Sequence, residues 1–267
     1  RLIKFLNRIL FRKDIHYKIR EKFFHFKRQN FKDAFKDQKD LLYNLDDIVI
    51  FDVGSHTGKT INMYRSTFPN SQIFAFEPTE SSYKKLINQF YNDTKINVSL
   101  LGLSNKKENM TFYLSESDNL NSFKKPNQRA WGFEKKETAV VETNTLDNIC
   151  AINNIRNIDI LKLDVQGSEL DVLKGSHSFL SASKIGLIYV EWQVVPLYKE
   201  HSRYYQIGEY LGQYGYELFN LYSINEARSG QIRWGDSIFI NTKIREKLIS
   251  RYGKGQGSGW GVKIFLL

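Results

Sequence analysis

The stretch FDVGSHTGKT, residues 51–60, contains a glycine turn that looks like the end of a phosphate-binding loop. A phosphate loop has four residues between its two glycines, so that successive N–H groups surround the phosphates of a nucleoside triphosphate. Only three residues separate Gly54 from Gly58 here. The turn is therefore a different one, and Lys59 and Thr60 are expected to be ordinary residues in the first turn of a helix.

Two acidic residues accompany this turn. Asp52 comes just before it, and Glu77 ends the next apolar stretch, at a distance that suits hydrogen bonds to the two hydroxyls of a ribose. NAD needs a G-x-G-x-x-G turn for its pyrophosphate, and an acid at the start of the turn repels that group. Asp52 instead favours a cation, and S-adenosylmethionine carries an ammonium and a sulfonium. The charge therefore favours S-adenosylmethionine as the cofactor.

Apolar and helical stretches alternate around the turn, which indicates an α/β fold with a parallel sheet. Strands are expected at 47–53, 71–78, 96–104, 158–164, 184–192, 216–222 and 236–241, and helices at 59–65, 81–91, 145–153, 168–175 and 204–215. Thr145 and Ser168 are predicted helix caps, and Gly175 a helix stop. Residues 116–137 are polar and are expected to form an irregular lid. Ligands of such folds bind at the carboxyl ends of the strands.

Two carboxylates end predicted strands at that edge and are candidates for accepting a proton from a substrate hydroxyl. These are Asp164 and Glu191, and His201 is a third candidate in a loop expected over the cleft. Nothing in the sequence completes a metal-ligand set around the two carboxylates, so no required metal is expected. Lys162 lies within a predicted buried strand and needs a partner that the sequence does not name.

Several segments occur in an order typical of a known family. FDVGSHTG, AFEP, TLDNI, ILKLDVQGSELDVLKG, YVEW and DSIFI resemble FkbM-type methyltransferases, a branch of the class I S-adenosylmethionine-dependent methyltransferases. The resemblance covers about residues 47–241. It implies a Rossmann-like, seven-stranded mixed sheet of order 3-2-1-4-5-7-6 and O-methylation of small or glycan hydroxyls. The family more often has Asn at the position of His56 and Glu at that of Gln166.

The resemblance also implies roles for single positions. The methionine part of the cofactor would be lined by Asp52, Gly54, Ser55, His56 and Gly58. Glu77 would hold the ribose, Leu103 to Asn105 (with Ser104 between them) would edge the adenine, and Asp164 would face cofactor and substrate together.

The net charge of +10 is unevenly distributed, because residues 1–40 hold 13 Lys and Arg against 5 Asp and Glu. We expect a basic helical extension at 1–45, a methyltransferase domain at 46–252 and a glycine-rich tail at 253–267. Leu2, Phe5, Leu6 and Ile9 share one face of the first helix. That face is expected to pack on the domain, to mediate self-association, or to lie on an anionic membrane surface.

The substrate is expected to be a glycan or another small hydroxylated acceptor. Aromatic side chains expected near the cleft mouth suit a sugar ring, and basic residues of the lid suit an acidic glycan; these are Trp131, Trp192, Tyr198, Tyr204, Tyr205 and Trp234, and Lys124, Lys125 and Arg129. The single cysteine suits a reducing compartment, so a cytoplasmic protein is expected. No apolar run is long enough to span a bilayer.

The leading interpretation is an O-methyltransferase for a sugar hydroxyl of a glycan or glycolipid precursor. A nucleic-acid or other small-molecule methyltransferase is the first alternative. Against nucleic acid, most of the excess positive charge lies outside the methyltransferase region. The second alternative is a non-catalytic cofactor-binding or scaffold domain.

Overall fold

The computed structural model describes residues 33–127 and 137–252. The chain forms two compact units, Arg1–Asp33 and Ala34–Leu267, and the following description concerns the second. The predicted basic helices up to residue 32, the glycine-rich tail, Arg129 and Trp131 lie outside the described residues. Membrane contact and self-association through the amino-terminal helices therefore stay predictions.

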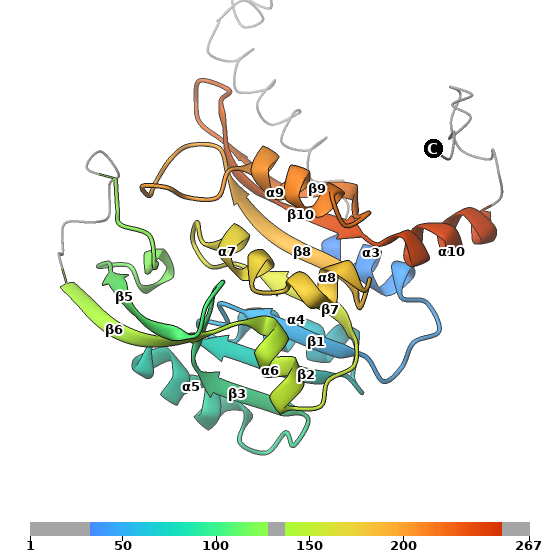
Figure 1. Ribbon diagram of the computed structural model, residues 1–267, viewed down its shortest axis with the longest axis horizontal. Helices are drawn as coiled ribbons and strands as arrows, with labels where there is room; N and C mark the ends of the chain where they lie inside the picture. Colours follow the sequence, from blue (N-terminus) through green and yellow to red (C-terminus); the bar gives the residue numbers. More distant parts are fainter. Residues whose placement is uncertain (1–32, 128–136, 253–267) are drawn as a thin grey trace, which may run out of the picture. The chain divides into compact units, whose positions relative to one another are not determined.

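A seven-stranded sheet forms the centre of the second unit (Figure 1). Its strands, in spatial order, are β3 (Ile96–Leu100), β2 (Gln72–Glu77), β1 (Val49–Val53), β7 (Ile158–Leu163), β8 (Ile185–Gln193), β10 (Ile232–Ile240) and β9 (Glu217–Glu226). The first five are parallel, and β10 is antiparallel to both of its neighbours. Counted along the chain within this sheet, the order is 3-2-1-4-5-7-6. The predicted fold class is confirmed.

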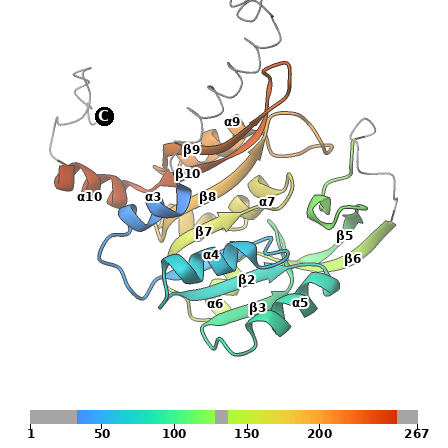
Figure 2. The same ribbon diagram turned by 180° about the vertical axis from the view of Figure 1, so that it is seen from behind.

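Helices cover both faces of this sheet (Figures 1 and 2). One face packs against α6 (Leu146–Ile152), α7 (Glu169–Lys174), α8 (His177–Ser181) and α9 (Tyr204–Gly212). The other packs against α3 (Ala34–Leu41), α4 (Lys59–Thr67), α5 (Glu80–Phe90) and α10 (Thr242–Tyr252). Because the central strands are buried on both faces, they read as nearly continuous apolar runs. A polar residue inside such a strand is therefore conspicuous.

The amino-terminal boundary of the domain differs from the expected residue 46. The α3 residues Ala34 and Leu41 are buried in the same hydrophobic cluster as Ile50 and Tyr64. The Tyr64 hydroxyl also donates a hydrogen bond to Gln38 of α3, at 3.2 Å. This helix is therefore part of the domain core rather than of a separate extension.

A second, three-stranded sheet of order β4-β6-β5 lies next to the carboxyl ends of the main strands. It consists of β4 (Gly102–Leu103), β6 (Glu137–Asn144) and β5 (Glu108–Leu114). The single strand expected at 96–104 is wrong, because the chain leaves the main sheet at Leu101 and Gly102 pairs with β6 instead. The strand β6 was not predicted, although its TAVVET segment is rich in β-branched residues.

All three predicted helix ends lie at the expected residues, and two of the three act as predicted. The Thr145 hydroxyl accepts a hydrogen bond from the Asn148 N–H, at 3.1 Å, and Gly175 ends α7. Ser168 makes no capping hydrogen bond. The neighbouring Glu169 carboxylate instead accepts the N–H groups of Val165 and Gly167.

The glycine turn gives a test of this fold. Gly54 has a φ of +83°, and a Cβ at this position would overlap the carbonyl oxygen of Asp164. We therefore expect Gly54→Ala to lower the free energy of unfolding by about 3–5 kcal/mol in chemical denaturation. Gly212→Ala is the matched control, because nothing lies within 4 Å of the added methyl group. It should be neutral or stabilising by up to about 1 kcal/mol; equal effects of the two changes would contradict the close approach.

Candidate functional site

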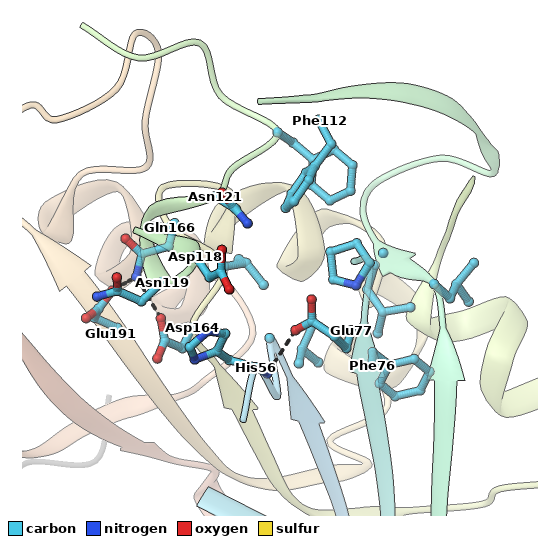
Figure 3. Close-up of a pocket in the computed structure, with 18 residues that line it drawn as sticks. His56, Phe76, Glu77, Phe112, Asp118, Asn119, Asn121, Asp164, Gln166 and Glu191 are labelled. Carbon is cyan, nitrogen blue, oxygen red and sulfur yellow. Dashed lines mark hydrogen bonds between the residues drawn. The ribbon is translucent and has the colours of Figure 1, made fainter. Parts of the chain in front are cut away.

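A cavity lies at the carboxyl ends of the central strands, where β1 and β2 meet β7 and β8 (Figure 3). Its floor comes from the ends of these strands, and its roof from the segment 101–123. We call it the acidic cavity, because its lining holds four carboxyl groups and, among the described residues, no lysine or arginine. It is lined by Val53, Gly54, His56, Phe76, Glu77, Pro78, Leu101, Gly102, Leu103, Phe112, Asp118, Asn119, Asn121, Phe123, Asp164, Val165, Gln166 and Glu191.

The glycine turn between β1 and α4 is not built to cradle phosphate. The Gly54 and Ser55 N–H groups both donate to the Phe76 carbonyl, and the Gly58 N–H donates to the Ser55 carbonyl. The His56 N–H donates to the Glu77 carboxylate at 2.8 Å. A phosphate loop needs such N–H groups free for its ligand. These are taken, so the geometry agrees with the spacing argument.

Glu77 is held rigidly at one side of the cavity (Figure 3). One of its carboxylate oxygens accepts the His56 N–H, and the other accepts both the N–H and the hydroxyl of Thr79, at 3.0 and 2.5 Å. The side chain is only 5% exposed. A carboxylate oxygen has two lone pairs, so the oxygen bound to His56 can accept another donor, such as a sugar hydroxyl.

Beneath the turn lies a buried ion pair. Asp52 of β1 and Lys162 of β7 are register partners, so their side chains lie side by side on one face of the sheet. The Lys162 ammonium is 3.2 Å from the Asp52 carboxylate and 3.5 Å from that of Asp164, and it donates to the Gly54 carbonyl at 3.1 Å. Burial alone would lower the pKa of Lys162, but these carboxylates raise it above the usual lysine value. The partners of the buried Lys162 are therefore Asp52 and Asp164.

Gln166 joins the two candidate proton acceptors at the other side of the cavity. Its side-chain amide donates to the carboxylates of Asp164 and Glu191, both at 2.9 Å. Its amide oxygen accepts from the Tyr198 hydroxyl at 3.1 Å, and its carbonyl oxygen accepts from the Ser122 hydroxyl at 2.6 Å. Gln166 has a φ of +52°, a conformation that needs such support from its surroundings. We call Asp164, Gln166 and Glu191 the carboxylate clamp (Figure 3).

Burial raises the pKa of two carboxyl groups, one in the carboxylate clamp and one next to it. For Glu191, burial and then the carboxylates of Asp164 and Glu169 raise the pKa well above its usual range. For Glu169, burial raises the pKa to about 7, against the N–H groups of Gly167 and Val165, which lower it. A carboxyl group with a raised pKa is a stronger proton acceptor once it is ionised.

Five predicted site residues lie in the acidic cavity: Gly54, His56, Glu77, Asp164 and Glu191. Five others do not. Asp52 is fully buried beneath the turn, where its carboxylate contacts the Lys162 ammonium instead of the cavity. Ser55 turns inward, and its hydroxyl donates to the Asp52 carbonyl. Gly58 faces α5, where a Cβ would overlap Phe90 and Leu86.

Ser104 and His201 also lie outside the acidic cavity. Ser104 is buried outside the cavity, where its N–H donates to the Asn144 carbonyl; Leu101 to Leu103 form the cavity wall instead. His201 is 7% exposed and lies against Gly167, with its Nδ1 atom 3.2 Å from the Tyr198 carbonyl oxygen. It lies outside the described lining of both the acidic cavity and its neighbour, so its role as a base stays a prediction. Burial also lowers the pKa of His201.

Gln166 was not predicted as a site residue, although it belongs to the stretch that carries the family resemblance. Asn119 and Asn121 were expected in a lid, and both line the acidic cavity. The lid residue Lys124 is paired with Asp171 at 2.6 Å, so its charge is already compensated. Of the expected mouth aromatics, Trp192 and Tyr198 are buried, whereas Trp234 lines a second cavity.

The second cavity adjoins the first, and the two share the side chains Asn119, Gln166 and Glu191. Its other lining residues are Ser117, Leu120, Gln193, Val195, Leu197, Arg233 and Trp234. Within the described ranges 33–127 and 137–252, no group of three His, Cys, Asp or Glu side chains is arranged to hold a metal ion. The same residues include no helix that is long and apolar enough to cross a membrane.

A family model described as the methyltransferase FkbM domain matches residues 52–218, more than half of the chain. The chain belongs to this family. The predicted family is thereby confirmed. The matched segment runs from Asp52 in β1 to the start of β9 and includes the carboxylate clamp.

Two curated methyltransferases are similar to this FkbM-domain chain. The 2-O-methyltransferase NoeI of Sinorhizobium fredii is 24% identical over 163 residues, which cover 57% of this chain and 66% of that protein. Methyltransferase 1 of Beauveria bassiana is 27% identical over 146 residues, which cover 49% and 59%. The chain thus spans less than two thirds of either relative. Among solved structures, a precorrin-6Y C5,15-methyltransferase from Geobacter metallireducens aligns at 10% identity with a TM-score of 0.44. The alignment covers 78% of this chain and 88% of that chain.

The residues of the acidic cavity fit S-adenosylmethionine. Four carboxyl groups favour a ligand with an ammonium and a sulfonium, and the absence of lysine and arginine from the described lining disfavours a pyrophosphate. The apolar side chains of Phe76, Leu103 and Phe112 offer a surface for an aromatic base. Glu77 adds a carboxylate oxygen that can accept a further hydrogen bond, as from a hydroxyl group.

The raised pKa of Glu169 predicts how stability changes with pH. Its folded-state pKa of about 7 lies above the ordinary 4.5, so the folded protein keeps a proton that the unfolded chain releases between these values. The stabilisation is complete below pH 4.5 and is lost as the pH rises through 7. Between pH 4.5 and 8 the free energy of unfolding should therefore fall less in Glu169→Gln than in the unaltered protein, by up to roughly 3 kcal/mol. Chemical denaturation at several pH values measures this difference.

The control for this series is Glu80→Gln. Glu80 is paired with Lys84 on the surface, and that contact lowers the pKa of its carboxyl group. Its replacement should leave the pH slope between 5 and 8 as in the unaltered protein. If the free energy of unfolding of Glu169→Gln changes with pH as steeply as that of the unaltered protein, Glu169 is ionised throughout this range and the prediction is wrong.

Proposed function

We propose that this chain transfers a methyl group from S-adenosylmethionine to a sugar hydroxyl of a glycan or a glycolipid precursor. The observation that supports it most is the carboxylate clamp, because Gln166 and Glu191 are shared by the acidic cavity and the second cavity. An acceptor hydroxyl in the second cavity therefore meets its proton acceptors next to the cofactor cavity. The Sinorhizobium relative is a 2-O-methyltransferase, which supports oxygen as the accepting atom.

Bound S-adenosylmethionine supplies an activated methyl group on a positively charged sulfur. The residues Gly54, His56 and Glu77 would hold it in the acidic cavity, with Glu77 accepting hydrogen bonds from the ribose. Positioning of two reactants in line supplies much of the rate of such a transfer. The roof residues Phe112, Phe123 and Leu103 contribute apolar side chains to the lining of the cavity.

The carboxylate clamp removes the proton of the acceptor hydroxyl. Glu191 accepts the proton at a carboxylate oxygen, since burial and neighbouring carboxylates raise the pKa of this group. Gln166 donates to both carboxylates and so keeps them at a fixed separation. Lys162 holds the Asp164 carboxylate from below and limits the repulsion between the two.

Titration calorimetry with S-adenosylmethionine and with NAD tests the cofactor. We expect micromolar binding of S-adenosylmethionine and no binding of NAD. Glu77→Ala should weaken the binding of S-adenosylmethionine by about tenfold or more, because a hydrogen bond to a charged group is lost. Glu80→Ala, which removes an exposed carboxylate at the start of α5, should leave binding unchanged. Absence of S-adenosylmethionine binding to the folded, unaltered chain would refute the proposal.

Transfer of labelled methyl groups to a panel of hydroxylated sugars tests the base. We expect Glu191→Gln to lower the turnover rate by about 10²–10⁴-fold while S-adenosylmethionine still binds. The rate of the unaltered protein should rise with pH, because a carboxyl group with a raised pKa must first lose its proton to act as a base. This rising limb should be missing in Glu191→Gln. Full activity of this variant with the same pH profile would exclude Glu191 as the base.

A further inference from the structure

The second cavity holds a cation that the proposed reaction does not use. The Arg233 guanidinium lies over the ring of Trp234, with 4.4 Å from Cζ to the ring centroid, and its Nε–H donates to the Asn225 side-chain oxygen at 2.8 Å. No ion pair of Arg233 with a carboxylate occurs in the described part of the chain. Stacking on one side and a hydrogen bond at Nε hold the group in place and leave its two terminal nitrogens for a ligand.

The strand geometry explains why two consecutive residues line this cavity. In a regular strand, neighbouring side chains point to opposite faces. The pairing of β10 with β9 shifts register on both sides of Trp234, and such irregularities re-aim side chains. On the other side of β10, Trp234 pairs with Gln193 of β8, so Gln193 lies next to the stacked pair.

Gln193 contributes a second observation that points to a ligand. Its side chain is 5% exposed, and its amide nitrogen is 3.4 Å from the Gln166 oxygen. Its own amide oxygen is buried and has no hydrogen-bond donor among the described residues. A buried acceptor without a donor is costly, and a hydroxyl group in the cavity would satisfy it. The second cavity therefore offers an oxygen for a sugar hydroxyl as well as a cation.

The two cavities differ in charge in a way that separates their ligands. The described lining of the acidic cavity has carboxylates but neither lysine nor arginine, whereas the second cavity has Glu191 at the shared wall and Arg233 farther along β10. A guanidinium binds carboxylate and phosphate groups through paired hydrogen bonds. We infer that the acceptor is an acidic sugar, whose hydroxyls meet Gln193 and the carboxylate clamp and whose phosphate or carboxylate group pairs with Arg233.

This inference rests on the proposed function, and binding of named probes tests it. The probes are glucose 1-phosphate, glucuronic acid and methyl glucoside, titrated by calorimetry or ligand-observed NMR into the full chain saturated with S-adenosylhomocysteine. At least one anionic probe should bind about tenfold or more tightly than methyl glucoside, since a charge-assisted hydrogen bond is lost in the neutral probe. If only glucose 1-phosphate binds more tightly than methyl glucoside, the acceptor is a phosphate-linked sugar. If only glucuronic acid does so, the acceptor is an acidic glycan.

Arg233→Gln should abolish the preference for the anionic probes, whereas Arg233→Lys should keep part of it. Arg228→Gln is the matched control, because it removes the same charge from an exposed position in the turn between β9 and β10 and should leave the preference intact. Equal binding of neutral and anionic probes, no binding of either anionic probe, or an unchanged preference in Arg233→Gln would overturn the inference.

S-adenosylmethionine binding, measured in the same preparations, separates this inference from the proposed function. If the unaltered chain binds S-adenosylmethionine but shows no anionic preference, the acidic-sugar inference is wrong and the proposed function stands. If it does not bind S-adenosylmethionine, the proposed function itself is wrong.

Discussion

The buried contact of Lys162 with Asp52 and Asp164 is the constraint on which the site depends. A lysine in the centre of a sheet would be strongly destabilising without compensation, and its removal would leave two carboxylates close together with no cation between them. The same ammonium donates to the Gly54 carbonyl, so one group ties β1, β7 and the glycine turn together. The position of the cavity floor relative to the carboxylate clamp follows from this single contact.

The charge argument from sequence was right about the cofactor, but the ion pair places the Asp52 carboxylate beneath the cavity and not in its lining. Asp52 shares a face of β1 with Ile50, and Lys162 shares a face of β7 with Ile160, so both point into a helix-covered layer. The strand periodicity alone contains this information. The pairing register between two strands more than 100 residues apart does not follow from sequence, so no partner for Lys162 could be named.

The strand ends were the most predictable part of the site. Glu77, Asp164 and Glu191 each follow or end an apolar stretch, and parallel strands bring their carboxyl ends to one edge. Ser104 and His201 lie outside the acidic cavity, and their positions could not be predicted because they depend on how loops pack. The amide bridge of Gln166 was not predicted for a related reason: its partners come from four separate segments, and its left-handed backbone conformation is visible only in the fold.

The two parts of the acidic cavity come from different stretches of the chain. The floor comes from the ends of strands in the main sheet, whereas the roof comes from residues 101–123, where Phe112 packs edge-on against Phe123 with the ring centroids 4.6 Å apart. Leu103 of the roof belongs to the hydrophobic cluster that packs against the helices of one face, but Phe112 and Phe123 belong to neither of the two buried clusters. Replacements of these two phenylalanines would change the shape of the roof while the strand ends of the floor stay in place. The roof of this enzyme can therefore diverge in evolution without repacking of the two layers that flank the main sheet.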